Sequence, residues 1–188
     1  MNTKNIQHAD SISPYSLTNL WRALQKPVFV NSPSPPPNVE IPDDWDLFTH
    51  NYVHDCTPRE CNIYHSPSRS DDTKGTIFYS LGWKTHPLQK RAVIESLQDS
   101  GFNVLTMPLV ESHDKIGTME ENITRMESSI FNEQSIVHSL KQENAPLFVL
   151  THSTSATVFE TAQMNAKSED PYGLPDIDFV VHTNPFIN

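Results

Sequence analysis

Hydrophobic and polar positions follow two different spacings along the chain beyond Trp45. Short apolar runs, rich in β-branched and aromatic residues, predict buried strands near residues 76–80, 103–107, 147–151 and 178–182. Between these runs, apolar residues recur at helical spacing over residues 85–101, 118–142 and 155–166. Strands and helices therefore alternate, which is typical of the α/β class with a mostly parallel sheet flanked by helices.

The predicted helices have recognisable ends. Pro87 falls in the first turn of the first helix, and Gly101 stands at its C-terminal cap. Thr118 and Glu121 have the spacing of a capping box at the start of the second helix. The apolar stripe that follows lies on one face, so we expect a single helix over residues 118–142.

The region before the first buried strand has a different pattern. Residues 46–55 and 59–67 read as two strands separated by a turn around Thr57-Pro58, which predicts an antiparallel hairpin. Residues 1–44 contain a short amphipathic helix followed by a proline-rich connector. That helix packs on the domain or forms a membrane-surface or lid element. Residues 45–188 form the α/β domain.

Composition excludes several kinds of partner. The 188-residue chain has a formal net charge of -10, so we expect no nucleic-acid partner. It has no apolar run of about 18 residues and no N-terminal secretion signal, which favours a soluble cytoplasmic protein without a transmembrane segment. His50, His54, Cys56 and Cys61 lack any standard zinc-ligand spacing. We therefore expect no metal and no cofactor.

The segment LFVLTHSTSATVF, from Leu147 to Phe159, carries an apolar strand through Ser153 into small residues that can begin a helix. A serine hydroxyl on such a turn is a useful nucleophile only if a base takes its proton and N–H donors hold the developing oxyanion. Without those groups it is an ordinary N-cap. This segment alone leaves both interpretations open.

From about Asp46 to Asn188, the chain resembles the N-terminal half of an α/β-hydrolase of the serine aminopeptidase and lysophospholipase type. SLGWKTHPLQKRAVIESLQDSGFNVLTMPL is similar to that family's oxyanion loop with the helix and strand after it, and HSTSA stands at the nucleophile elbow. The resemblance implies a partial α/β-hydrolase domain over residues 45–188. Its sheet would be truncated after the strand that follows the nucleophile helix.

The resemblance also assigns roles to individual residues. Ser153 would be the catalytic nucleophile, and the backbone N–H groups of Trp83 and Thr154 would form the oxyanion hole. Thr151 and Ser155 replace the two glycines of the G-x-S-x-G elbow pattern. Ser155 is small enough for helix and strand to approach, whereas the β-branched Thr151 crowds a place that glycine leaves open. Leu81 stands where the family has an oxyanion-loop histidine.

The family's triad acid and histidine follow later strands, and no residue of this chain occupies their places. His86 and His113 follow the oxyanion loop and the next strand, and His182 ends the last predicted strand. These three histidines are candidates for lining the cleft, with solvated loop positions as the alternative. We expect His152 to act in packing or in bracing the loop.

Two functions follow from these residues. The first is a serine-type acyl hydrolase that cleaves a small carboxylic ester or a lipid-like substrate such as a lysophospholipid, with Ser153 as nucleophile. The second is a catalytically inactive, hydrolase-like scaffold that acts as a binding module. In either case a partner chain could complete the fold, and the lone chain is expected to be nearly inert toward esters because its nucleophile lacks an assigned base.

Overall fold

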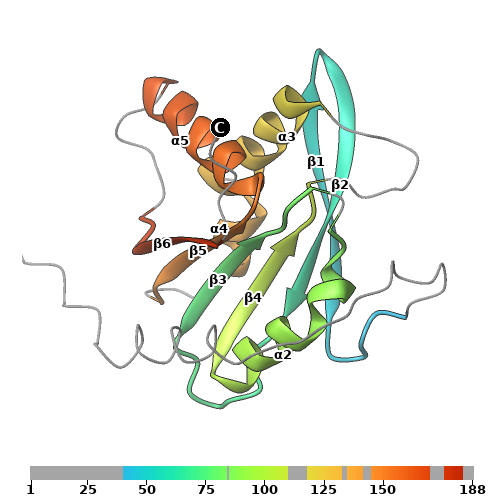
Figure 1. Ribbon diagram of the computed structural model, residues 1–188, viewed down its shortest axis with the longest axis vertical. Helices are drawn as coiled ribbons and strands as arrows, with labels where there is room; N and C mark the ends of the chain where they lie inside the picture. Colours follow the sequence, from blue (N-terminus) through green and yellow to red (C-terminus); the bar gives the residue numbers. More distant parts are fainter. Residues whose placement is uncertain are drawn as a thin grey trace, which may run out of the picture.

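The computed structural model describes residues 40–83, 85–109, 118–132, 135–141, 145–169 and 176–183. In chain order the elements are β1 (Asp46–His54), β2 (Thr57–Ser66), β3 (Gly75–Ser80), the 3₁₀ turn η1 (Pro87–Lys90), α2 (Arg91–Asp99), β4 (Phe102–Met107), α3 (Met119–Met126), the π-helical turn η2 (Glu127–Phe131), α4 (Ile136–Leu140), β5 (Leu147–His152), α5 (Ser155–Glu169) and β6 (Phe179–Thr183). Figure 1 shows helices on both sides of a twisted sheet.

The strands form one sheet in the order β1-β2-β4-β3-β5-β6. β4, β3, β5 and β6 are parallel, and the β1–β2 hairpin joins the β4 edge through an antiparallel pairing. All six residues of β3 and all six of β4 are buried, because helices cover both of their faces. The prediction of a mostly parallel α/β sheet is confirmed, and the four predicted strands lie within two residues of their expected positions.

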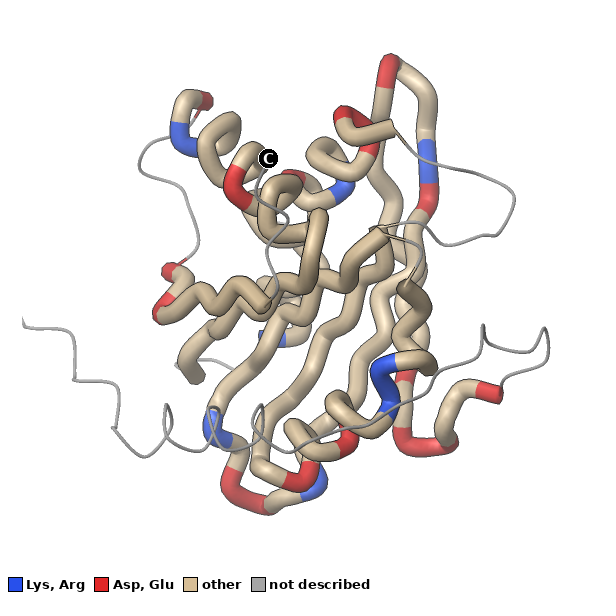
Figure 2. Tube along the Cα trace, viewed as in Figure 1, with Lys and Arg blue, Asp and Glu red and all other residues tan. Residues whose placement is uncertain are grey.

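Alternate side chains of the central strands enter two hydrophobic clusters. On one face, Ile77 and Phe148 pack against Ile94 and Leu97 of α2. On the opposite face, the cluster contains buried residues of α3, η2, α4 and α5: Met126, Ile130, Phe131, Val137, Val158, Phe159 and Ala162. The residues of these strands are uncharged, and Figure 2 shows the charged residues around the rim of the molecule. Successive side chains of these strands point to opposite faces of the sheet, so the short apolar runs of the sequence make both faces apolar.

The β1–β2 hairpin is present, but its predicted turn was wrong by two residues. The turn lies at Asp55-Cys56, and both residues have positive φ, 49° and 58°. Two-residue hairpin turns require this conformation because its twist matches that of the strands, and they usually contain glycine or asparagine. The sequence has neither residue at this turn, and the prediction relied on Pro58, a residue common in turns, and was therefore wrong. Pro58 instead lies within β2, opposite Val53.

The hairpin extends beyond the sheet and is anchored to α3 and η2 by polar contacts. Tyr52 donates a hydrogen bond to Glu121 Oε1 at 2.9 Å, and His50 Nε2 contacts Ser128 Oγ at 3.0 Å. Buried Arg125 lies 5.9 Å from the centre of the Tyr52 ring and donates to the carbonyl oxygens of Pro108 and Leu109. Arg125 thus ties the end of β4 to α3 and to the hairpin.

The single helix predicted over residues 118–142 was wrong. It is broken into α3, η2 and α4, and Asn132 has extended backbone after η2. Thr118 caps α3 as predicted, accepting from Glu121 N at 3.1 Å, whereas the Glu121 carboxylate turns to Tyr52. A second cap explains the break, because the Ser135 hydroxyl accepts from His138 N at 3.2 Å and starts α4. The first predicted helix is confirmed as η1 and α2, followed by Gly101 with φ of 93°.

The predicted N-terminal helix and most of the proline-rich connector lie outside the described residues. At the described end of that connector, Ile41 packs against the cluster that α2 covers, and buried Trp45 donates to Gln98 Oε1 at 3.2 Å. None of the helices in the described ranges is both long and apolar enough to cross a membrane.

Candidate active site around Ser153

Ser153 lies on a sharp turn between β5 and α5. β5 ends at His152, α5 begins at Ser155, and Ser153 has φ of 57°, which is unusual for a residue other than glycine. Such a backbone costs on the order of 1–3 kcal/mol and persists only where the surrounding structure holds it. The predicted position of Ser153, between a buried strand and the helix after it, is confirmed.

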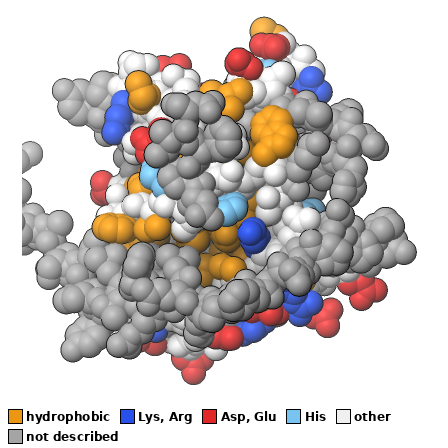
Figure 3. Space-filling model, viewed as in Figure 1, with side chains coloured by type: hydrophobic (Ala, Val, Ile, Leu, Met, Phe, Trp, Pro, Cys, Tyr) orange, Lys and Arg blue, Asp and Glu red, His pale blue; other side chains and the backbone are white. Residues whose placement is uncertain are grey.

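The turn stands at the edge of the sheet where the parallel strands end. β5 pairs with β3 on one side and with β6 on the other, so the residues that follow β3, β5 and β6 meet there. In open α/β sheets this edge is where ligands bind, because connecting loops and helix N-termini converge on it. Figure 3 shows histidine side chains beside hydrophobic ones in the middle of this face of the molecule.

Gly82 brings the loop after β3 against the turn. A side chain at Gly82 would place its Cβ 3.0 Å from the His152 carbonyl oxygen and 3.1 Å from Ser153 Cβ. Both distances are tighter than ordinary van der Waals contact, so a larger residue here would force the neighbouring backbone to shift by a few tenths of an ångström. The loop that the resemblance assigned to the oxyanion hole therefore lies directly beside the assigned nucleophile.

Ser155 ties α5 to the end of β3. Its hydroxyl donates to the Ser80 carbonyl oxygen at 2.8 Å, lies 3.0 Å from the His152 carbonyl oxygen, and accepts from His152 N at 2.9 Å. Ser155 is fully buried, so these contacts replace water for two strand ends and for the first turn of the helix. A small residue is needed there, and serine adds hydrogen bonds that glycine lacks.

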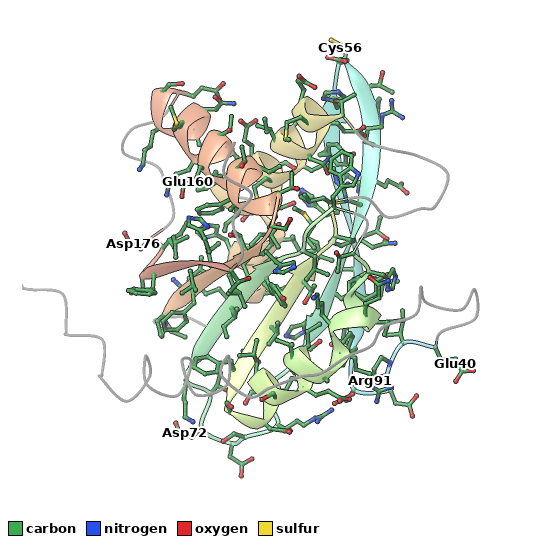
Figure 4. All side chains as sticks on the ribbon, in the orientation of Figure 1. Glu40, Cys56, Asp72, Arg91, Glu160 and Asp176 are labelled. Atoms are coloured by element: carbon green, nitrogen blue, oxygen red, sulfur yellow. The ribbon has the colours of Figure 1, made fainter. Side chains whose placement is uncertain are left out.

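Thr151 is accommodated by the neighbouring strand. Its side chain is buried, and its hydroxyl lies 2.6 Å from His182 Nδ1 on β6. The same imidazole contacts Glu160 Oε1 of α5 through Nε2 at 2.8 Å, and Figure 4 labels Glu160 on that helix. The predicted crowding is accommodated because the Thr151 hydroxyl contacts His182 on the neighbouring strand β6.

Two backbone N–H groups are available near Ser153. Within the described part of the chain, neither Trp83 N–H nor Thr154 N–H donates a hydrogen bond. The Trp83 side chain packs against the cluster that α5 covers, and this contact holds the loop that contains Gly82 and Trp83 against the domain. Unused donors from these two positions are what an oxyanion hole requires.

The described candidate histidines have other partners. His86 caps η1: its Nδ1 accepts from Leu88 N at 3.2 Å, and its Nε2 lies 3.2 Å from Tyr64 Oη. His182 uses both ring nitrogens, for Thr151 and Glu160. His113 lies outside the described residues. Among the residues that the structure describes, none hydrogen-bonds to Ser153 Oγ.

His152, whose side chain lies on the other face of β5 from that of Thr151, supports the turn. Its Nδ1 lies 3.2 Å from Thr183 Oγ1 at the end of β6. Burial lowers the pKa of His152, and the positive charge of Lys90 lowers it further, so the imidazole is neutral at pH 7. Thr183 was missed by the sequence analysis because only the pairing of β5 with β6 reveals its place, and no local motif marks it.

The arrangement offers a strained serine at the sheet edge, a close-packed glycine, and two amides that donate no hydrogen bond to any residue the structure describes. A nucleophile of this kind attacks a carbonyl carbon, and the amides stabilise the resulting oxyanion. Among the described residues, no general base is hydrogen-bonded to Ser153 Oγ.

Comparison with known proteins supports the fold. No protein-family model and no curated protein matches the sequence. A brefeldin A esterase, a bacterial homologue of human hormone-sensitive lipase, matches with a TM-score of 0.56 and 14% identity over 99% of this chain and 52% of that chain. A bacterial heroin esterase matches with a TM-score of 0.52 and 14% identity over 76% of this chain and 45% of that chain.

Esterase 2 of Thermogutta terrifontis matches with a TM-score of 0.54 and 13% identity over 76% of this chain and 58% of that chain. The chain thus spans about half the length of these solved structures. At such low identity the similarity concerns the fold, and the serine aminopeptidase and lysophospholipase type stays a prediction. The described residues have the mostly parallel, helix-flanked sheet of the α/β-hydrolase fold.

Proposed function

We propose that this chain carries the nucleophile and oxyanion hole of a serine-type acyl hydrolase that cleaves carboxylic esters. The observation that carries this proposal is the left-handed backbone of Ser153 on the turn between β5 and α5, against which Gly82 packs. An N-capping serine has extended backbone and needs no such strain, so a plain capping role leaves this conformation unexplained.

In the proposed reaction, Ser153 Oγ bonds to the carbonyl carbon of the ester while its proton passes to a general base. The carbonyl oxygen becomes an oxyanion, which accepts hydrogen bonds from Trp83 N–H and Thr154 N–H. Collapse of this intermediate expels the alcohol, which takes up a proton, and leaves an acyl group on Ser153. Water then hydrolyses the acyl-enzyme and regenerates the serine.

The base and its acidic partner come, in this proposal, from outside the described residues. His86 and His182 are committed to contacts elsewhere, whereas His113 remains a candidate. A partner chain that completes the fold is the other proposed source. The similarity to proteins named as esterases supports an ester substrate, and a lysophospholipid would be one lipid-like member of that class.

A second function is an inactive, hydrolase-like scaffold that serves as a binding module. It is favoured by one observation: among the described residues, no side chain is bonded to Ser153 Oγ. A serine without a base within about 3 Å stays protonated at neutral pH, and positioned amides alone give little acceleration over water.

The test is labelling of the 188-residue chain with a fluorophosphonate and hydrolysis of short p-nitrophenyl esters. We expect slow labelling and little turnover, with labelling lost in Ser153→Ala and kept in Ser168→Ala. Ser168 is a suitable control because it is an exposed serine near the far end of α5.

Three other outcomes are informative. Labelling that persists in Ser153→Ala would refute the assigned nucleophile. A folded chain that never labels would favour the inactive scaffold. Rapid labelling would show that a base lies within the chain, and alanine substitutions of His86, His113 and His182 would then identify it.

A further inference from the structure

Thr183, the last residue of β6, contacts the serine turn. Its carbonyl oxygen accepts a hydrogen bond from Ser153 N at 3.0 Å, and its hydroxyl donates to the Thr151 carbonyl oxygen at 2.9 Å. The same hydroxyl lies 3.2 Å from His152 Nδ1. One threonine therefore contacts three consecutive residues that lead into and form the strained turn.

The direction of these hydrogen bonds determines the tautomer of His152. A hydroxyl has one proton, and Thr183 donates it to a carbonyl oxygen, which can only accept. The contact with His152 must therefore run from Nδ1–H to the Thr183 hydroxyl oxygen. Because the lowered pKa keeps the ring neutral, Nε2 carries the lone pair.

His152 is also close to the oxyanion loop. Its Cδ2, the ring carbon bonded to Nε2, would lie 3.3 Å from a Cβ placed on Gly82. A rotation of this ring would therefore push against the backbone that precedes Trp83. The Thr183 hydroxyl fixes the His152 ring. It thereby stabilises both the serine turn and the loop that carries the Trp83 N–H, one of the two proposed oxyanion donors.

We propose that Thr183 is a positioning residue for Ser153. Its hydroxyl joins Thr151 and His152, the two residues that lead into the left-handed turn, and fixes His152 as the Nδ1–H tautomer beside Gly82. This proposal rests on the proposed nucleophilic role of Ser153. It assigns Thr183 no contact with substrate, because Thr183 acts through His152 and the backbone of the turn.

The experiment compares Thr183→Val, which keeps the shape but removes the hydroxyl, with Thr183→Ser, which keeps the hydroxyl. The matched control is Thr161→Val, which removes a threonine hydroxyl that donates to a backbone carbonyl on α5, far from the turn in sequence. The full 188-residue chain is used, and all proteins are compared by urea unfolding, by fluorophosphonate labelling of Ser153, and by ¹⁵N NMR of the His152 ring.

We expect the wild type and Thr183→Ser to show the Nδ1–H tautomer and similar labelling rates. Thr183→Val should label at least about tenfold more slowly and show a mixture of tautomers, since small displacements at a reacting centre cost large factors in rate. Thr161→Val should match the wild type in both measurements.

Wild-type labelling in a folded Thr183→Val chain would overturn the proposal. So would an Nε2–H tautomer in the wild type, a measurement that needs no variant and decides the case if Thr183→Val does not fold. If the wild type never labels, the nucleophilic role of Ser153 fails instead, and the tautomers of the wild type and Thr183→Val still decide whether Thr183 holds the turn.

Discussion

At the residue scale, Gly82 lets the loop after β3 pass close to Ser153, the proposed nucleophile. In Gly82→Ala the new methyl group would meet the His152 carbonyl oxygen at 3.0 Å and Ser153 Cβ at 3.1 Å, so the loop or the turn must shift by a few tenths of an ångström. We expect fluorophosphonate labelling of Ser153 to slow by about tenfold, because the amides and the hydroxyl lose their relative placement. An unchanged labelling rate would show that the two segments move independently.

Ser155 offers a test of how the turn is stabilised. In Ser155→Ala the Ser80 carbonyl oxygen loses its donor and His152 N loses its acceptor, both beside a fully buried side chain. We expect the free energy of unfolding, measured with urea, to fall by about 1–3 kcal/mol. Ser168→Ala is the control, since it removes an exposed hydroxyl that donates to the Asn165 carbonyl oxygen, and equal losses in the two variants would contradict this account.

Single residues of the site were predictable to different degrees. The turn at Ser153 was predicted from an apolar run that ends in small residues, whereas the loop that contains Gly82 was placed beside it only by the family resemblance. The contacts of Thr151 with His182 and of Thr183 with His152 did not follow, because they depend on which residues of β5 and β6 face each other. No local spacing encodes that register.

At the element scale, the β1–β2 turn has a strained residue that glycine would relieve. Cys56 has φ of 58° and is exposed at the tip of the hairpin, where Figure 4 labels it. We expect Cys56→Gly to raise the free energy of unfolding by about 1 kcal/mol, since a left-handed conformation penalises any residue with a Cβ. Cys56→Ala keeps the Cβ and serves as control; a similar gain in both variants would assign the effect to loss of the thiol.

Elements were predicted well where hydrophobic spacing and end signals agreed. Pro87 and Gly101 bounded a segment whose apolar residues keep one helical period, and η1 with α2 lies between them. Over residues 118–142 the apolar stripe suggested continuity, but Ser135 supplied a cap for a new helix and η2 widened the preceding turn. Ser135 can either continue a helix or cap the start of a new one, and capping prevailed here. Hydrophobic periodicity carries no information about this choice.

At the scale of the whole molecule, partly buried histidines link stability to pH. Burial lowers the pKa of His50 and His65, with the Arg125 charge adding to the effect at His50 and Asp46 opposing it at His65. A histidine whose folded-state pKa lies below its unfolded value of 6.5 binds fewer protons in the folded state. Its stabilising contribution is therefore complete above pH 6.5 and is lost as the pH falls through the folded-state pKa.

Other groups act on the same pH range. The net charge of -10 diminishes as the pH falls toward the sequence pI near 5.2, which reduces self-repulsion and favours the folded state. Burial also raises the pKa of Glu127, a shift with the opposite consequence for stability, because protonation of a desolvated carboxylate is favourable. The dependence of the free energy of unfolding on pH combines all these effects. A comparison of variants is therefore needed to separate the contribution of the histidines.

We therefore predict a difference between two pH profiles. From pH 7 to pH 5 the urea midpoint of the wild type should fall more steeply, or rise less, than that of the double variant His50→Gln, His65→Gln, which has the same carboxylates and lacks the two partly buried imidazoles. Glutamine keeps polar atoms near Ser128 Oγ, which His50 Nε2 contacts at 3.0 Å. Any loss of stability that the substitutions cause at pH 7 would shift the whole curve of urea midpoint against pH without changing its slope. Parallel profiles would mean that these imidazoles carry no proton linkage, because their desolvation would then be the same in the folded and unfolded chains.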